Sequence, residues 1–234
     1  MKLHIFNPEH DIALAANQER FTAPHAGRRL RTDLGFIPAF WASEGDMVLV
    51  DDVEAAIEAR RHLSKFGKDV VFVTYADLKA FAFEDVESFQ VDPWGWDRTI
   101  KEQLLRANSN LQSFMPSDDT LAAIREMSSR RFAAEHLLPL LREAGEEKTV
   151  GEARYCTTME NVKQTMAQNG KSVLKSPWSS SGRGVRYAET AAPDAHLEGW
   201  AANVVKRQGG IMVEPLYNKV YDFGLEFFSN ADGT

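Results

Sequence analysis

The sequence predicts an α/β fold with a parallel sheet near the N-terminus. Apolar runs of strand length occur at three places, residues 3–6, 47–50 and 70–73. Between the last two, residues 53–66 have the spacing of an amphipathic helix, with Ala56, Ile57 and Leu63 on one side. Strands that alternate with helices form parallel sheets with both faces covered. We therefore expect the first hundred residues to fold as a small open α/β domain.

Capping and turn residues mark the other elements of this domain. Asn7 and Pro8 follow the first strand directly, and they suit the cap and the first position of a helix. A second helix is predicted at residues 22–35, with Thr22 as its N-cap and Gly35 as its C-terminal stop. Proline and glycine at residues 92–97 predict a break, after which a helix at residues 98–108 follows.

A second break at residues 115–119 predicts a domain boundary near Pro116. A chain of 234 residues favours two compact units, or one long α/β domain with an appendage. We place the two units at residues 1–115 and 116–234. The second unit begins with a helix at residues 121–141 that Ser128 and Ser129 interrupt. A further helix at residues 158–167 has Thr158 as its N-cap.

The end of the sequence predicts an unfinished hairpin. Residues 221–228 are strand-like, and the polar turn at residues 229–234 follows them at once. A hairpin needs two strands, so we expect the chain to stop short of a complete domain and to be a fragment of a longer protein.

Charge and cysteine content exclude several classes of protein. The formal net charge is −7, opposite in sign to that of most nucleic-acid-binding proteins, so local groups must hold any anionic ligand. The single cysteine, Cys156, cannot form an internal disulfide or a multi-cysteine zinc site. The N-terminus does not resemble a signal peptide, and no apolar run approaches the roughly 20 residues that cross a bilayer. We expect a cytoplasmic protein with no membrane or nucleic-acid partner.

The most informative window is a lysine followed by a loop of small residues. Lys175 ends an apolar strand, where its ammonium group has a fixed position. The next residues offer backbone N–H groups and hydroxyls with little steric obstruction, which suits phosphate binding, and a flexible surface hairpin is the alternative. The loop matches neither the Walker nor the dinucleotide-binding fingerprint. Its candidate residues are Ser179, Ser180, Ser181, Gly182, Arg183 and Gly184.

A second strand with a carboxylate near its end completes the pattern. Residues 209–216 are strand-like and contain Glu214 and Pro215, and Asp222 lies on the next strand-like run. Glu214 could accept a hydrogen bond from a ribose hydroxyl or an exocyclic amine. Because proline lacks an N–H, we expect Pro215 to leave a strand edge open to a flat ligand.

The order of these features resembles the ATP-grasp superfamily. Lys175, the Ser/Gly loop and Glu214 match its strand lysine, its phosphate loop and its nucleoside-binding strand, with 39 residues from lysine to glutamate. The resemblance implies a Rossmann-like pre-ATP-grasp domain with a parallel sheet, followed by a partial ATP-grasp α+β domain. It also implies ADP-forming ligation of a carboxylate to an amine or thiol through an acyl phosphate, with ATP and Mg²⁺ as cofactors.

The resemblance implies residue roles as well. Lys175 would hold phosphate oxygens, Arg183 and the loop amides would cover them, and Glu214 would fix the nucleoside. The family's further basic residue, usually lysine, corresponds to Arg130 or Arg131, and we assign it to Arg131. The remaining candidate contacts to the nucleotide are Val213, Leu216 and Asp222. The family's magnesium ligands, a late acidic residue and a Glu-x-Asn pair, are absent up to Thr234, so we expect them beyond residue 234 and expect these 234 residues to be inactive.

Other candidates have plainer explanations beside the functional ones. His10 could bind a substrate amine, although helix capping around it is the alternative. Arg28 could bind a carboxylate or phosphate near a helix N-terminus, although such arginines usually face water. Trp178 could cover the nucleotide or simply pack in the core.

Two other classes of protein also fit the sequence: a non-catalytic nucleotide sensor, and an α/β interaction protein that binds no nucleotide. The sequence does not determine the oligomeric state, and a homo-oligomer is one of the states it allows.

Overall fold

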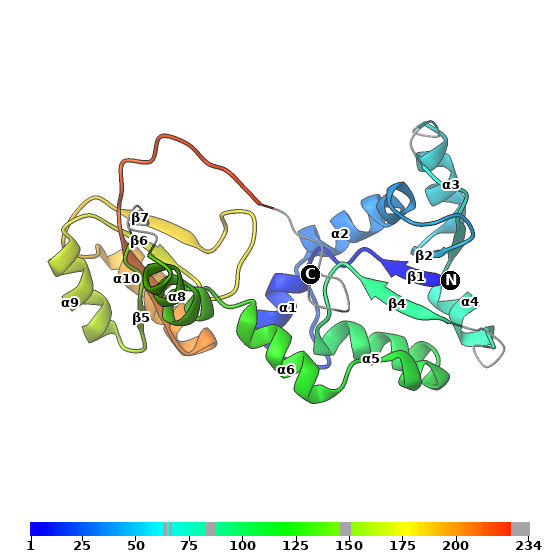
Figure 1. Cartoon of the computed structure of the whole chain (residues 1–234), viewed down its shortest axis with the longest axis horizontal. Coiled ribbons are helices and arrows are strands. Elements are labelled where there is room, and N and C mark those ends of the chain that lie inside the picture. The colour runs from blue at the N-terminus through cyan, green and yellow to red at the C-terminus, as the bar shows by residue number, and fades with distance from the viewer. Residues whose placement is uncertain (63–64, 66, 83–87, 146–150, 226–234) are drawn as a thin grey trace.

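The chain folds into two four-stranded sheets connected by helices (Figure 1). The structure is a computed structural model, and it describes residues 1–62, 65, 67–82, 88–145 and 151–225. The first sheet is parallel and the second is antiparallel, so the chain has a mixed α/β fold, as predicted.

The first sheet has the strand order β3-β2-β1-β4, and all its pairs are parallel. Its strands are β1 (Lys2–Ile5), β2 (Met47–Leu49), β3 (Val71–Val73) and β4 (Gln90–Pro93). The first three were predicted, whereas the expected break at residues 92–97 overlaps the end of β4. Pro93 is compatible with a strand here because β4 lies at the edge of the sheet, where a missing N–H is tolerated.

The helices of this part follow the predicted alternation with the strands. They are α1 (His10–Ala16), α2 (His25–Leu34), the 3-10 helix η1 (Ile37–Phe40), α3 (Val53–Arg61), α4 (Tyr75–Ala80), α5 (Arg98–Ala107) and the 3-10 helix η2 (Ser109–Phe114). A buried cluster that includes Leu3, Ile5, Leu49 and Leu104 packs the sheet against α4 and α5.

Two predicted helix caps are wrong. The residues before α1 and α2 are Glu9 and Pro24, and neither makes a side-chain cap hydrogen bond. Asn7 is buried, and its Oδ1, the atom that would cap α1, accepts from the N–H of Gly95 over 3.3 Å while its amide donates to the Gly95 oxygen over 2.8 Å. Thr22 lies ahead of Pro24, outside α2.

One predicted core residue of α3 is also wrong. Ala56 is buried as expected, but the side chain of Ile57 is 49% exposed because α3 contacts the sheet mainly along β3. Leu63 lies outside the described residues.

The second sheet has the order β5-β8-β6-β7, with antiparallel pairs throughout. Its strands are β5 (Arg154–Cys156), β6 (Ser172–Lys175), β7 (Val185–Ala188) and β8 (Ile211–Pro215). Helices α9 (Met159–Asn169) and α10 (Ala195–Gln208) pack against one face through a buried cluster that includes Val162, Leu174, Ala201, Ile211 and Val213. Thr158 caps α9 as predicted.

One prediction in this part holds only in part, and another is wrong where the structure describes it. β8 lies between β5 and β6, so Pro215 is not on an edge strand, but β5 pairs only with residues 211–213, and Glu214 and Pro215 stay unpaired on that side. Of the strand predicted at residues 221–228, residues 221–225 form no strand and their large apolar side chains are exposed, and residues 226–228 lie outside the described residues. The turn expected at residues 229–234 lies outside the described residues.

A run of short helices connects the two sheets. It contains α6 (Asp118–Met127), α7 (Arg130–Phe132), the π-helix η3 (Ala133–Leu137) and α8 (Leu138–Glu143), with the predicted interruption at Ser128 and Ser129. In Figure 1, α6 lies between the two sheets, and α1 contacts α10. Among the described residues, no helix combines the length and apolar character needed to cross a bilayer.

Candidate functional site

Lys175 and Glu214 lie next to each other on one face of the antiparallel sheet. The register pairs Lys175 with Met212 and Val173 with Glu214, which puts all four side chains on the same face. The Lys175 Nζ lies 2.5 Å from Glu214 Oε2, and the two side chains are 30% and 22% exposed. The opposite face, which includes Leu174 and Val213, is covered by α9 and α10. The predicted pair therefore shares one half-buried position that solvent can reach.

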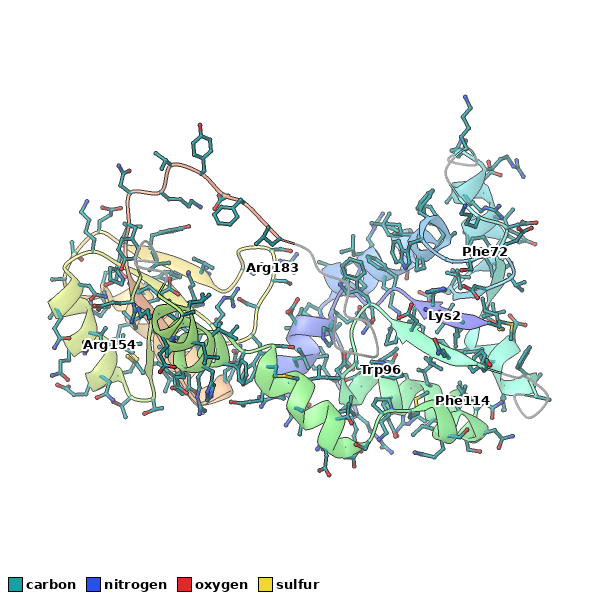
Figure 2. All side chains as sticks on the ribbon, in the orientation of Figure 1. Lys2, Phe72, Trp96, Phe114, Arg154 and Arg183 are labelled. Atoms are coloured by element: carbon teal, nitrogen blue, oxygen red, sulfur yellow. The ribbon has the colours of Figure 1, made fainter. Side chains whose placement is uncertain are left out.

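The loop after Lys175 is a hairpin, as predicted, and it joins β6 to β7. The N–H of Ser176 donates to the oxygen of Gly184 over 2.8 Å and closes its base. At its tip, Ser181 and Gly182 have positive φ angles of 52° and 71°, a conformation that small residues adopt most easily. Figure 2 shows Arg183 on the part of this loop that extends away from the sheet. Its side chain is exposed and makes no hydrogen bond or ion pair with the described residues.

Gly184 has a separate structural reason to lack a side chain. A Cβ at this position would overlap Ser179 Oγ and approach Ser176 Cβ to 3.0 Å. The two ends of the loop can pack together only because residue 184 is glycine.

Arg130 holds this loop in place. Its guanidinium donates to the backbone oxygens of Ser176 (2.6 Å) and Ser179 (3.0 Å) and to Ser179 Oγ (2.8 Å). Burial lowers the pKa of the Arg130 guanidinium, with weaker opposing effects from Asp11 and Glu214, but arginine stays charged at neutral pH. This guanidinium therefore supports the loop backbone from α7.

Arg131, the residue assigned from the resemblance, points elsewhere. Its Nε donates to Glu135 Oε2 over 2.7 Å, and its guanidinium lies 5.2 Å from the ring centroid of Tyr155. The structure brings Arg130 rather than Arg131 to the loop, and the role of Arg131 in nucleotide binding stays a prediction.

The other candidate contacts are dispersed. Val213 is buried against the helices, and the N–H of Leu216 donates to the oxygen of Lys171 over 3.0 Å. Asp222 is exposed and pairs with Lys219 Nζ at 2.8 Å, within a segment that is not a strand. Trp178 is buried, with the Arg125 guanidinium 3.8 Å from its ring centroid, so it packs in the core and its ring does not cover an open nucleotide site.

In the N-terminal part, His10 and Arg28 have different surroundings. His10 Nδ1 lies 3.0 Å from Asp97 Oδ2, and its ring occupies the space beside Gly95, which is a packing role. Arg28 borders a cavity of about 670 Å³ whose wall also includes Arg31 and Tyr75. Arg31 and Tyr75 were missed from the sequence, although Arg31 lies one helical turn after Arg28 and Tyr75 follows the end of β3.

The described residues contain no group of three histidine, cysteine, aspartate or glutamate side chains placed to hold a metal ion. The single cysteine, Cys156, is buried, and burial raises the pKa of its thiol, with a weaker opposing effect from Thr165. A protonated, buried thiol is unreactive, as expected for a structural residue.

Ten chains of solved structures are similar to this chain, including the following two. One is a RimK domain ATP-grasp protein from Sphaerobacter thermophilus, with 23% identity and a TM-score of 0.37 over 75% of this chain. The other is the ATP-grasp ligase PsnB, solved with a phosphomimetic variant of its minimal precursor, Mg and ADP, with 14% identity and a TM-score of 0.33 over 75% of this chain. Both are ATP-grasp proteins. This chain spans 64% of the first ATP-grasp protein and 66% of the second. No protein-family profile and no curated protein matches the chain.

Proposed function

We propose that this chain binds ATP in the manner of ATP-grasp ligases and supplies the phosphate and nucleoside contacts for an ADP-forming ligation. The observation that carries the proposal is the contact between Lys175 and Glu214 on one sheet face, beside a hairpin of small residues. Once this ion pair opens around a ligand, the ammonium group can bind a phosphate and the carboxylate can accept from the adjoining nucleoside.

The ion pair explains how the site stays stable without a ligand. Lys175 is about one-third exposed and is neutralised by Glu214. In the proposed complex, phosphate oxygens replace Glu214 as the partner of the Lys175 ammonium group, and Glu214 accepts hydrogen bonds from the nucleoside. Charge-assisted contacts of this kind are about twice as strong as neutral hydrogen bonds.

The loop supplies the remaining contacts to phosphate. Arg130 is committed to the loop backbone, whereas the Arg183 guanidinium is exposed at the tip. The proposed complex therefore uses Arg183 as the mobile cation and Arg130 as the fixed support. We place the nucleotide unit at residues 116–234 and the preceding unit at residues 1–115.

The proposed reaction joins a carboxylate to an amine or thiol through an acyl phosphate. Its charge develops on the transferred phosphoryl group, so fixed cations lower the barrier by electrostatic stabilisation. Magnesium would enter with ATP and would supply charge neutralisation for the transferred phosphoryl group. The described residues do not form a three-ligand site for that ion.

Lys175→Ala tests the assignment directly. Loss of the ammonium group should weaken ATP binding at least tenfold, about 1.4 kcal/mol, as measured by titration calorimetry. The melting temperature should change little, because a partly exposed ion pair contributes at most about 1 kcal/mol to stability.

The chain offers a matched control directly before the same strand. Lys171 lies just before the first residue of β6, whereas Lys175 is its last residue. The Lys171 Nζ pairs with Glu189 Oε2 at 2.6 Å, which makes a second lysine–glutamate pair. Lys171→Ala should leave ATP affinity unchanged. Equal ATP affinity in the wild type and Lys175→Ala, or no thermal stabilisation of the wild type by ATP with magnesium, would remove the proposal.

A further inference from the structure

The N-terminal part contains a cavity of about 670 Å³ at the carboxyl ends of the parallel strands. Glu9, Asp51 and Tyr75, which border it, follow β1, β2 and β3 respectively. Helices α2 and α5 supply the other walls. The chain leaves β1 toward β2 and returns to β4 on the other side of β1, and open α/β sheets bind ligands at such positions. The volume is in the usual range for small-molecule sites.

A closed hydrogen-bond network forms one wall of this cavity. Arg31 donates to Glu9 Oε1 (3.0 Å), Gln103 Oε1 (3.2 Å) and the Tyr75 hydroxyl (2.6 Å), and Tyr75 donates to Gln103 Oε1 (3.1 Å). Burial raises the pKa of Tyr75, against the opposing effect of Arg31, so its O–H stays available as a donor. The network fixes the Glu9 carboxylate and uses one of its two oxygens.

The second oxygen of Glu9 has no partner. Glu9 is 9% exposed, and its Oε2 is buried and accepts no hydrogen bond from the residues that the structure describes. An unpartnered buried acceptor costs about 1–3 kcal/mol, and more when it is charged. Glu9 Oε2 therefore lacks an N–H donor, and the ammonium group of a ligand would supply both the donor and a charge of opposite sign.

Arg28 supplies the opposite chemistry at the rim of the cavity. It lies three residues before Arg31 on α2, which puts both on the same side of the helix. Its side chain makes no hydrogen bond or ion pair with the described part of the chain. A free guanidinium binds a carboxylate through two parallel hydrogen bonds.

We infer that this cavity binds a small zwitterion of the amino-acid class, with its ammonium group on Glu9 and its carboxylate on Arg28. The inference is independent of the proposed nucleotide site, because none of the residues that carry it belongs to the antiparallel sheet.

A competing explanation concerns a second, much smaller void. It measures about 10 Å³, enough for one water molecule, and Glu9 borders it together with Asn7 and Asp97. A water there would give Glu9 Oε2 its donor without any ligand. The two explanations differ in whether removing the charge of Glu9 changes ligand binding.

The test uses the twenty amino acids as probes, each at millimolar concentration, with ligand-observed NMR followed by calorimetry on the 234-residue chain. At least one free amino acid should bind the wild type. Its N-acetyl derivative, which lacks the ammonium group, and its amide, which lacks the carboxylate, should each bind about tenfold more weakly or worse.

Two variants assign the contacts. Glu9→Gln keeps the shape of the side chain and should weaken binding of the same amino acid at least tenfold. Arg28→Gln changes an exposed residue, preserves the fold and should have a similar effect. Arg29→Gln is the matched control, because Arg29 pairs with Asp33 and lies outside the wall of the cavity. It should bind like the wild type.

Two results would overturn the inference. The first is that no amino acid binds the wild type. The second is binding that both Glu9→Gln and Arg28→Gln leave unchanged while thermal melts show folded protein, as a water in the small void would predict. Lys175→Ala should leave this binding intact, which separates failure here from failure of the nucleotide site.

Discussion

His4 is a buried side chain held between two carboxylates. Its Nε2 lies 3.1 Å from Asp46 Oδ2, and its Nδ1 lies 3.0 Å from Asp92 Oδ2. Burial opposes the charged imidazolium, but the two aspartates outweigh it and raise the pKa of His4 above 6.5. For Asp46, burial is outweighed by N–H donors from Lys2 and Ser43 and by His4, and its pKa falls below 3.8. The hydrogen bond from His4 lowers the pKa of Asp92 as well.

These shifts predict how stability depends on pH. The raised pKa of His4 stabilises the fold below the unfolded value of 6.5, and this contribution is lost as the pH rises through the folded value. The lowered pKa values of Asp46 and Asp92 stabilise the fold above 3.8, and this contribution is lost as the pH falls through their folded values. His4, Asp46 and Asp92 together therefore stabilise the fold most between pH 3.8 and pH 6.5.

His4→Asn should remove this dependence. The free energy of unfolding, measured with urea at about pH 5.5 and about pH 8.5, should fall more for the wild type than for the variant, because only the wild type loses a buried ion pair as the pH rises. His62→Asn is the control, since His62 is exposed, and it should behave like the wild type. An equal fall in His4→Asn and the wild type would show that the imidazolium does not stabilise the fold.

At the scale of elements, local patterns predicted many strands and helices, whereas α4 and α10 were missed although Thr74 and Asp194 cap them locally. Long-range pairing decided other exceptions. The cap at Thr158 and the strand that ends in Lys175 depend on neighbouring residues, so the sequence predicts them. The position of β8 within its sheet depends on distant residues, because β8 pairs with strands that begin at residues 154 and 172, and local patterns do not predict it. The strand predicted at residues 221–228 fails in its described part, residues 221–225, because alternating apolar residues form a strand only where a partner strand pairs with them.

The candidate site was predictable to the same extent. The resemblance to the ATP-grasp superfamily, and not the period of the strands, predicted Lys175 and Glu214 as parts of one site. That β6 and β8 are neighbours, so that the two side chains share a face, is a finding of the structure. The choice between Arg130 and Arg131 depended on the direction of a short helix, which no sequence pattern determines. Arg31 is 22 residues from Glu9 and 44 residues from Tyr75 in the sequence. The cavity of about 670 Å³ that these residues border could therefore not be predicted.

Gly184→Ala tests the loop as an element. The added methyl group would overlap Ser179 and push apart the two ends of the hairpin loop. We expect a loss of stability of about 1–3 kcal/mol, typical of overpacking, together with weaker ATP binding measured by calorimetry.

Gly199→Ala is the matched control for the added methyl group. Gly199 lies inside α10, and a Cβ there would meet nothing within 4 Å. Alanine favours a helix interior over glycine by about 0.8–1.0 kcal/mol, so this variant should be more stable and should bind ATP like the wild type. If Gly184→Ala matched Gly199→Ala in both measurements, the close packing of the loop would be irrelevant to binding.

At the scale of the whole molecule, α6 links the two sheets through Arg125. Its Nε donates to the oxygen of Leu14 in α1 over 2.8 Å, and its guanidinium stacks 3.8 Å from the ring centroid of Trp178. Trp178 Nε1 donates back to the Arg125 oxygen over 2.9 Å. One residue thus contacts both the helix after β1 and the loop after Lys175.

Arg125→Ala should therefore lower the free energy of unfolding and remove a contact that holds the loop after Lys175 in place. It removes a cation–π contact and a charge-assisted hydrogen bond, and together these predict a loss of about 2–4 kcal/mol in the free energy of unfolding by urea. Arg125→Lys keeps the charge but loses the planar stack, so its loss should be intermediate. Arg207→Ala, on the exposed last turn of α10, should change little. Because Trp178 directly precedes the proposed phosphate-binding loop, ATP affinity should fall in the same order as stability. A stability loss without any change in ATP affinity would mean that the loop after Lys175 keeps its shape independently of α6.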